Sequence, residues 1–403
     1  MPSAKRRSKS VRAARGEKRK AARPKARAKA RSKARPKADA LDFQNAKIGT
    51  SDANAVILCE GALGTPTGKT GNGLLRRSRR YKIRGVIDST KAGQDAGQVL
   101  DGVPNGVPCY ASVDDALKKD PKIRTMIFGL ATDGGLLPSS MRPQIRRGIE
   151  RGLNIVSGLH EFISDDPEFA PLARRKGVDV FDIRKLPLLR PPNFFTGAIE
   201  KVKATVIASL GTDSAIGKRT TAWKIVEALE ELGYKAHMIA TGQTGIMQGA
   251  KYGFVLDSTV NDYVAGEIEA AVVACDNAER PDVIILEGQG SLTHPAYPGG
   301  FELIAAGRPQ GIVVQHAPAR KTLDGFPAFP MASIKHEIFL LEAFARKPVI
   351  AITINHEDMT RKQVDLIVRE YESRFNVPAC DPLWHGASKV AREIERRFLK
   401  KPE

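Results

Sequence analysis

The sequence has few cysteines and no long apolar run. Its four cysteines, Cys59, Cys109, Cys275 and Cys380, are scattered over 403 residues, and no two have C-x-x-C spacing. They indicate neither a disulfide framework nor a zinc knuckle, and they fit a reducing compartment. No apolar stretch approaches the roughly 20 residues of a membrane helix, and the first residues lack the hydrophobic centre of a secretory signal. We expect a cytoplasmic protein without a membrane segment.

Residues 1–40 lack aromatic side chains and contain only two acidic residues, Glu17 and Asp39, against 17 lysines and arginines. The rest of the chain is nearly balanced, with 47 basic and 43 acidic residues, so most of the net charge of +19 lies in this segment. So little apolar surface cannot support a core, and we predict disorder. The segment either contacts nucleic-acid backbone without sequence preference or is a solvated extension without a role.

The remaining length suits two α/β domains, which we place at residues 41–190 and 191–403 behind the tail at 1–40. Apolar strand-like runs alternate with helical patterns in both parts, and this alternation predicts parallel sheets. The predicted strands are Ala55–Cys59, Tyr81–Asp88, Thr125–Leu130, Leu153–Gly158, Val178–Ile183, Val206–Leu210, 235–240, Val283–Leu286, Ile312–Gln315 and Val349–Ile354. The first part is predicted to be Rossmann-like, and the proline-rich stretch Pro187–Gly197 to be the linker.

The stretch Thr205–Ala222 has the parts of a phosphate-binding loop. The apolar run Val206–Leu210 ends in a glycine-bounded loop, and a helical pattern follows. Backbone N–H groups of such a loop and of the helix N-terminus bind anions, and a lysine adds a point charge. The residues that we expect to bind the cofactor are Gly211, Thr212, Asp213, Ser214, Ala215, Ile216, Gly217, Lys218, Arg219, Thr220 and Thr221.

This loop departs from the common P-loop pattern in two ways. Five residues separate Gly211 from Gly217, where the pattern has four, and Arg219 follows Lys218 where a hydroxyl normally binds Mg²⁺. Moving the hydroxyls to Thr220 and Thr221 turns them about 100° or more around the helix. The sequence therefore favours phosphate binding over Mg²⁺-nucleotide hydrolysis, and the site is assigned no metal.

Several further polar residues follow predicted strands of the second part, where ligands of doubly wound sheets bind. Gln243, Thr244 and Gln289 are candidates for substrate binding, and His316 lies at the same edge. The candidates for catalytic base or amine anchor are Asp262, Glu287 and His294. Glu287 ends a hydrophobic strand, Asp262 opens a helix, and His294 lies in a turn before a proline. Each also has a purely structural interpretation, and the sequence does not rank them.

The first part contains a second glycine-rich loop, Glu60–Thr70, which ends in Gly68-Lys69-Thr70. Leu63 stands where a P-loop would have its first glycine, so the template fails. This loop is either a polar turn that faces a ligand or an ordinary β–α turn. Asp88 ends the second strand, where a dinucleotide-binding domain would bind ribose, but no G-x-G-x-x-G follows the first strand, so the indication of NAD is weak.

Several separated motifs together resemble one bacterial and archaeal family. They are GTDSAIGKRTTA, ATGQTGIM, VNDYVAG, EGQGSLTHPAY, CEGALGTPTGKTGNGLLR and VIDSTKAGQDAG. The family was long described as a domain of unknown function, and its members are now described as D-glutamate N-acetyltransferases. The resemblance covers about residues 45–400. It implies a Rossmann-like domain, a P-loop domain similar to dethiobiotin synthetase, and acetyl transfer from acetyl-CoA to D-glutamate.

Coenzyme A carries a pyrophosphate and a 3′-phosphate, so a phosphate loop without Mg²⁺ chemistry suits it. The alternative enzyme is an ATP- and Mg²⁺-dependent ligase or kinase, with Thr220 or Thr221, Asp262 and Glu287 around the metal. A third alternative is a nucleic-acid-associated protein that acts through its basic tail. We further expect a small-molecule amino-acid substrate and assembly with other copies of the chain.

Removing residues 1–40 is expected to leave catalysis intact, because this segment has no core-forming residues. A protein that starts near Leu41 should keep its kcat in a steady-state assay. A loss of more than about tenfold, or about 1.4 kcal/mol in the activation barrier, would contradict this expectation. Retention on a nucleic-acid column at low salt should disappear with the segment, and for the full chain it should weaken steeply as salt rises.

Overall fold

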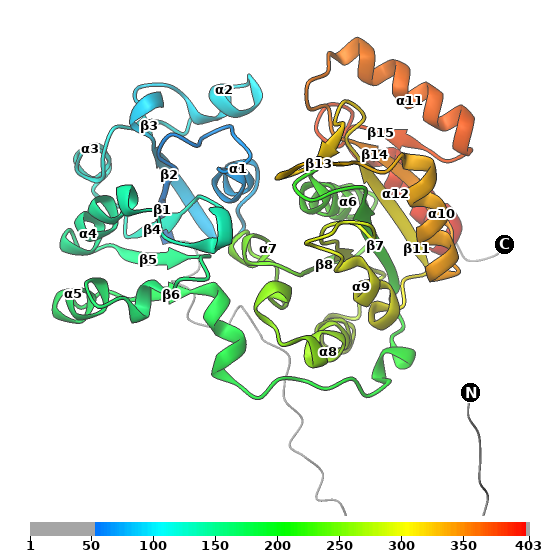
Figure 1. Cartoon of the computed structure of the whole chain (residues 1–403), viewed down its shortest axis with the longest axis horizontal. Coiled ribbons are helices and arrows are strands. Elements are labelled where there is room, and N and C mark those ends of the chain that lie inside the picture. The colour runs from blue at the N-terminus through cyan, green and yellow to red at the C-terminus, as the bar shows by residue number, and fades with distance from the viewer. Residues whose placement is uncertain (1–52, 400–403) are drawn as a thin grey trace, which may run out of the picture. The chain divides into compact units, whose positions relative to one another are not determined.

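The computed structural model describes residues 53–399 (Figure 1). The expectation of disorder for residues 1–40 lies outside the described residues. Among residues 53–399, every helix is too short or too polar to cross a bilayer.

The N-terminal domain contains a six-stranded parallel sheet in the order β3-β2-β1-β4-β5-β6. This is the strand order of a Rossmann fold, so the predicted Rossmann-like architecture is confirmed. The strands are β1 (Ala53–Leu58), β2 (Tyr81–Ile87), β3 (Cys109–Tyr110), β4 (Thr125–Phe128), β5 (Asn154–Ser157) and β6 (Val180–Asp182). The helices are α1 (Lys69–Arg76), α2 (Ala96–Asp101), α3 (Val113–Lys119), α4 (Arg142–Glu150) and α5 (Phe169–Lys176).

The sequence pattern missed helix α1, which has the sequence KTGNGLLR. Gly71 and Gly73 lie inside it, and each glycine costs roughly 1 kcal/mol of intrinsic helix propensity. Tertiary packing overrides that cost. A Cβ at Gly71 would lie 3.1 Å from the side chain of Ile57 on β1, so a larger residue would push the helix and the sheet apart by a few tenths of an ångström.

The C-terminal domain contains a seven-stranded parallel sheet in the order β15-β14-β11-β7-β10-β8-β9, as predicted for a P-loop domain. The strands are β7 (Thr205–Gly211), β8 (Ala236–Ala240), β9 (Tyr252–Gly253), β10 (Val283–Glu287), β11 (Gly311–His316), β14 (Val349–Ile354) and β15 (Ala379–Cys380). Strands β12 (Thr322–Leu323) and β13 (Phe326–Pro330) form a separate antiparallel hairpin. The helices are α6 (Lys218–Glu231), α7 (Gln243–Met247), α8 (Asn261–Glu279), α9 (Gly300–Gly307), α10 (Ile334–Ala345), α11 (Arg361–Phe375) and α12 (Ser388–Ile394).

Alternation along the central strands divides the core into two layers, because successive strand residues face opposite sides of a sheet. Ile207 and Ile285 pack in the same cluster as α6 and α12, whereas Val206 and Ile284 pack with α8, α9, α10 and α11. The doubly wound architecture is therefore confirmed. Helix α7 begins at Gln243, soon after β8 ends at Ala240.

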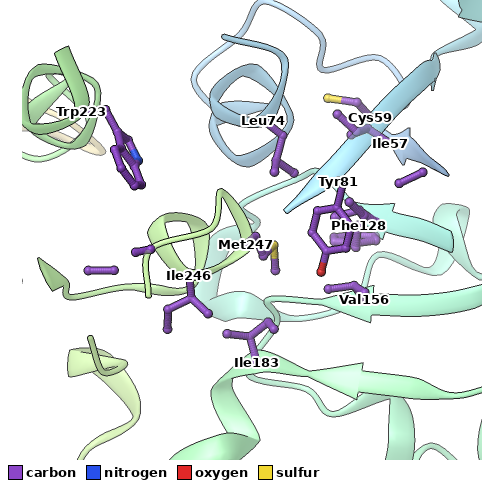
Figure 2. Close-up of a cluster of buried hydrophobic side chains, with 14 of the residues drawn as sticks. Ile57, Cys59, Leu74, Tyr81, Phe128, Val156, Ile183, Trp223, Ile246 and Met247 are labelled. Atoms are coloured by element: carbon purple, nitrogen blue, oxygen red, sulfur yellow. The ribbon is translucent and has the colours of Figure 1, made fainter. Parts of the chain in front are cut away.

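The two domains share one hydrophobic cluster. Side chains from the N-terminal sheet, such as Ile57 and Phe128, belong to the same cluster as Trp223 on α6 and Ile246 on α7 (Figure 2). Polar contacts accompany it, and the Nε2 of Gln248 donates to the carbonyl of Gly73 at 2.7 Å. These contacts fix α1 of the first domain against α6 and α7 of the second.

The predicted linker is held by two buried glutamates on α8. Glu269 accepts hydrogen bonds from the backbone N–H of Thr196 at 2.6 Å and of Ile199 at 3.1 Å. Glu267 accepts from the backbone N–H of Asn193 at 2.8 Å and from the guanidinium of Arg190 at 3.0 Å. Both carboxylates satisfy backbone groups of an irregular segment that has no strand partner, so they join the linker to the second domain.

Glu269→Ala is expected to lower the free energy of unfolding by about 2–4 kcal/mol, because it leaves linker N–H groups without an acceptor. Urea denaturation measures the change. Glu231→Ala is the matched control: Glu231 ends α6 and is exposed, so its removal should change stability by less than about 0.5 kcal/mol. Equal effects of the two substitutions would contradict this account of the linker.

Candidate functional site

The loop between β7 and α6 depends on two glycines. A Cβ at Gly211 would lie 2.5 Å from the carbonyl oxygen of Gln315 on the neighbouring strand β11, so a side chain does not fit there. Gly217 has a φ of 101°, which favours glycine, and it directly precedes the first residue of α6. These two positions set where the chain leaves the sheet and where the helix begins.

Six consecutive backbone N–H groups at this loop have no protein partner. Within residues 53–399, no hydrogen bond is donated by the N–H groups of residues 215–220. The first turn of any helix leaves such groups free, but here the loop residues Ala215, Ile216 and Gly217 add theirs. A run of unpaired N–H groups at a helix N-terminus is suited to bind an anion, which is the role that the sequence predicts for this loop.

Lys218 is buried beneath this loop. Its ammonium donates to the carbonyl oxygens of Asp213 and, at 2.7 Å, of Gly290. Burial lowers the pKa of Lys218 to about 8, although the nearby charge of Asp213 opposes the shift. Glu337 on α10 is also buried, and burial raises the pKa of its carboxyl group to about 7. The lysine thus ties the phosphate loop to the loop that follows β10.

The carboxylate of Asp213 organises a network that the sequence did not reveal. Its Oδ2 accepts from Arg320 at 2.8 Å and from the backbone N–H of Asp324 at 2.9 Å. Ser214 donates through its hydroxyl to Asp324 at 2.9 Å. Arg320 and Asp324 come from the segment around the β12–β13 hairpin, more than 100 residues away in the chain. No local pattern marks them, because only the register of β11 beside β7 brings this segment to the loop.

Glu287 lies at the carboxyl end of β10, which pairs with β7 so that Glu287 is opposite Ser209. The side chain is buried, and its Oε2 accepts from the backbone N–H of Thr241 at 3.0 Å. Burial raises the pKa of Glu287, and the neighbouring charges of Arg219 and Lys218 oppose that shift. A buried carboxylate next to the phosphate loop is suited to accept a proton or to bind an amine.

The two histidines near the loop already have protein neighbours. The Nδ1 of His294 accepts from the backbone N–H groups of Ala296 at 3.1 Å and Tyr297 at 3.0 Å, so the ring proton lies on Nε2, 3.5 Å from Asp213. Burial lowers the pKa of His294, which favours the neutral ring. His316 contacts the hydroxyl of Thr212 at 2.9 Å, and burial lowers its pKa to about 4.

The remaining predicted residues lie at different places around the loop. Thr244 contacts the hydroxyl of Thr70 at 3.0 Å, and Gln289 donates to the hydroxyl of Thr241 at 2.9 Å. A Cβ on Gly158, after β5, would meet the Gln243 side chain, so Gln243 packs against the first domain. Asp262 is exposed in the first turn of α8, and no hydrogen bond or ion pair within residues 53–399 joins it to the loop.

The hydroxyls that follow Lys218 differ in their surroundings. Thr221 is buried and donates to the side-chain carbonyl of Gln315, which also accepts from Thr353. Thr221 is therefore used to join α6 to strands β11 and β14. Thr220 is half-buried on the same turn.

Arg219 points away from Lys218. Its Nη2 donates to the carbonyl oxygen of Lys69 on α1 at 3.3 Å, and a Cβ on Gly73 would lie 2.7 Å from the same nitrogen. Burial lowers the pKa of Arg219, and the charge of Glu287 opposes the shift. The missing side chain at Gly73 leaves room for the guanidinium, which reaches the N-terminal domain.

Comparisons with known proteins agree with this architecture. The model described as "Domain of unknown function (DUF1611_N) Rossmann-like domain" matches residues 89–186, and "Domain of unknown function (DUF1611_C) P-loop domain" matches residues 193–391. The crystal structure of a DUF1611 family protein from Anabaena variabilis superposes with a TM-score of 0.79 and 27% identity, over 86% of this chain and 100% of that chain.

Two curated relatives carry a named activity. A protein of a Pseudoalteromonas species named D-glutamate N-acetyltransferase is 31% identical over 290 residues, which cover 70% of this chain and 84% of the relative. A protein of Tritonibacter scottomollicae with the same name is 29% identical over 273 residues, which cover 66% of this chain and 80% of the relative.

Proposed function

The chain belongs to the DUF1611 family, and on that premise we propose that it is an N-acetyltransferase that moves the acetyl group of acetyl-CoA to the amine of D-glutamate. The names of the two curated relatives support the reaction. One observation of the site carries the proposal: Glu287, a buried carboxylate, lies at the strand end beside a phosphate-binding loop. The loop would bind the phosphates of the acetyl donor, and Glu287 would act as the base for the amine of the acceptor.

The phosphate loop suits the donor. The free N–H groups of residues 215–220 and the charge of Lys218 provide contacts for the pyrophosphate or 3′-phosphate of coenzyme A. Thr221 is bonded to Gln315, and Arg219 occupies the position next to the lysine and faces the first domain. Both features favour anion binding over the alternative of a Mg²⁺-dependent kinase or ligase.

The chemistry needs a neutral amine, a proton acceptor and donors to the thioester oxygen. In our proposal the amine nitrogen attacks the carbonyl carbon of the thioester, and Glu287 accepts the proton that the nitrogen loses. The carbon–sulfur bond breaks, and the sulfur of coenzyme A leaves with a proton returned from Glu287. In the same proposal, backbone N–H groups of residues 288–290, directly after Glu287, stabilise the oxygen. Asp262 stays an alternative candidate for the base, and His294, whose Nε2 carries the ring proton, for the amine anchor.

Glu287→Gln is expected to lower kcat by about 10²–10⁴-fold, because the amide still accepts from Thr241 but cannot take a proton. The KM for acetyl-CoA should change little. As pH falls through the raised pKa of Glu287, the wild-type carboxylate becomes protonated, so its rate should fall, and this acidic limb should be absent from the variant. The matched control is Glu337→Gln, which removes another buried carboxylate near Lys218. Equal losses of kcat in the two variants would contradict the role of Glu287 as base.

The substitution Lys218→Ala distinguishes an acetyltransferase from an ATP- and Mg²⁺-dependent ligase or kinase. If the loop binds coenzyme A, the lysine is remote from the thioester, and its loss should mainly raise the KM for acetyl-CoA, by an amount equivalent to about 1.5–3 kcal/mol. Chelating Mg²⁺ should not change the rate. If the loop binds ATP for phosphoryl transfer, the same change should lower kcat by orders of magnitude, and chelation should abolish turnover.

Lys224→Ala is the control for Lys218→Ala, since Lys224 lies on the same helix and pairs with Glu227 at 3.0 Å near the surface. It should leave both kinetic constants unchanged. Thermal melting of each variant checks that the fold is intact. Phosphate released in step with turnover would show that the acetyltransferase proposal is wrong.

A further inference from the structure

The proposed function leaves unused the second glycine-rich loop, which ends in Gly68-Lys69-Thr70. In the structure it follows β1, and Lys69 is the first residue of α1. Within residues 53–399, the ammonium of Lys69 takes part in no hydrogen bond or ion pair, and the residue is exposed. Surrounding protein lowers the pKa of Lys69, and the charge of Asp324 opposes the shift. The ammonium is therefore open to an anionic ligand.

Arg219 brings a second cation to the same place. Its guanidinium lies on α1, where it donates to the carbonyl of Lys69 at 3.3 Å, and its Nε is buried with no hydrogen-bond partner among the described residues. Two neighbouring cations repel each other, and the Arg219 fork has N–H groups that the protein does not satisfy. An anionic group between them would relieve both costs, and a carboxylate matches the fork of an arginine.

Contacts give the order of the groups. A Cβ on Gly245, which lies on α7, would be 2.9 Å from the Oε2 of Glu287. Helix α7 packs against α1, where a Cβ on Gly73 would be 2.7 Å from the Nη2 of Arg219, and the same nitrogen donates to the carbonyl of Lys69. Arg219 therefore lies between the proposed base and Lys69.

We propose that Arg219 and Lys69 form the binding site for the two carboxylates of the acceptor amino acid, an inference that rests on the proposed function. The amine faces Glu287, and Arg219 binds the α-carboxylate, which is attached to the same α-carbon as the amine. Lys69, the cation farther from the base, binds the side-chain carboxylate. Arg219 thus belongs to the acceptor site, whereas the sequence had placed it with the phosphates. The N-terminal domain, through Lys69, selects a dicarboxylic acceptor.

Specificity constants for D-glutamate and D-glutamine test this assignment. Lys69→Met should lower kcat/KM for D-glutamate roughly 10- to 100-fold and leave kcat/KM for D-glutamine unchanged, because only the acid needs the ammonium. Arg219→Gln should lower both constants by similar factors, and Arg219→Lys should recover part of the loss. Neither change should alter the KM for acetyl-CoA. Lys118→Met, at an exposed position of α3, is the matched control and should change nothing.

Calorimetry with glutarate, a dicarboxylate without an amine, separates this inference from the reaction. Glutarate should bind the wild-type protein and the Lys118 variant, and at least tenfold more weakly the Lys69 and Arg219 variants. If wild type acetylates D-glutamate but Lys69→Met keeps its preference over D-glutamine, the carboxylate site is wrong and the function stands. If no acetyl transfer occurs yet glutarate binding needs both cations, the function is wrong and the carboxylate site stands. A wild-type protein that binds no glutarate, or an Arg219→Gln variant impaired only toward acetyl-CoA, overturns the inference.

Discussion

Six backbone N–H groups without protein partners, at residues 215–220, are the feature on which the rest of the site depends. Leaving such groups without an acceptor costs free energy, which a bound anion would recover. The close contact of Gly211 with Gln315 fixes where the loop starts. The hydrogen bonds of Lys218 to two backbone carbonyls join the loop to the segment that follows β10. Neighbouring strands then bring Glu287 and the Asp213 network to the same edge.

The two domains contribute different parts of the proposed reaction. The C-terminal domain supplies the phosphate loop and Glu287, and the N-terminal domain supplies Lys69. Helix α1 is fixed against α6 and α7 by a shared hydrophobic cluster and by the bond from Gln248 to Gly73. Because this packing is buried, it sets the separation between the proposed acceptor cations and the base without a mobile linker.

Most of the fold could be predicted because long apolar runs, such as Val206–Leu210, are buried strands whatever the context. Helix α1 could not, since its glycines oppose helix formation, and only tertiary packing explains them: Gly71 packs against Ile57, and Gly73 leaves room for Arg219. The phosphate loop could be located from the sequence because its glycines and its lysine lie together in one short stretch of the chain. Arg320 was missed because its place beside Asp213 depends on strand order, and the direction of Arg219 was missed because one residue of register turns a side chain toward the other domain.

Amide hydrogen exchange measured on peptides that cover residues 211–222 tests the central claim most directly. With acetyl-CoA and no Mg²⁺, exchange of the N–H groups at residues 215–220 should slow, because phosphate oxygens accept from them. A peptide from β2, Tyr81–Ile87, far along the chain from the loop, should exchange at an unchanged rate and serves as the internal reference. Unchanged exchange at 215–220 with acetyl-CoA, together with protection by ATP and Mg²⁺, would contradict the account.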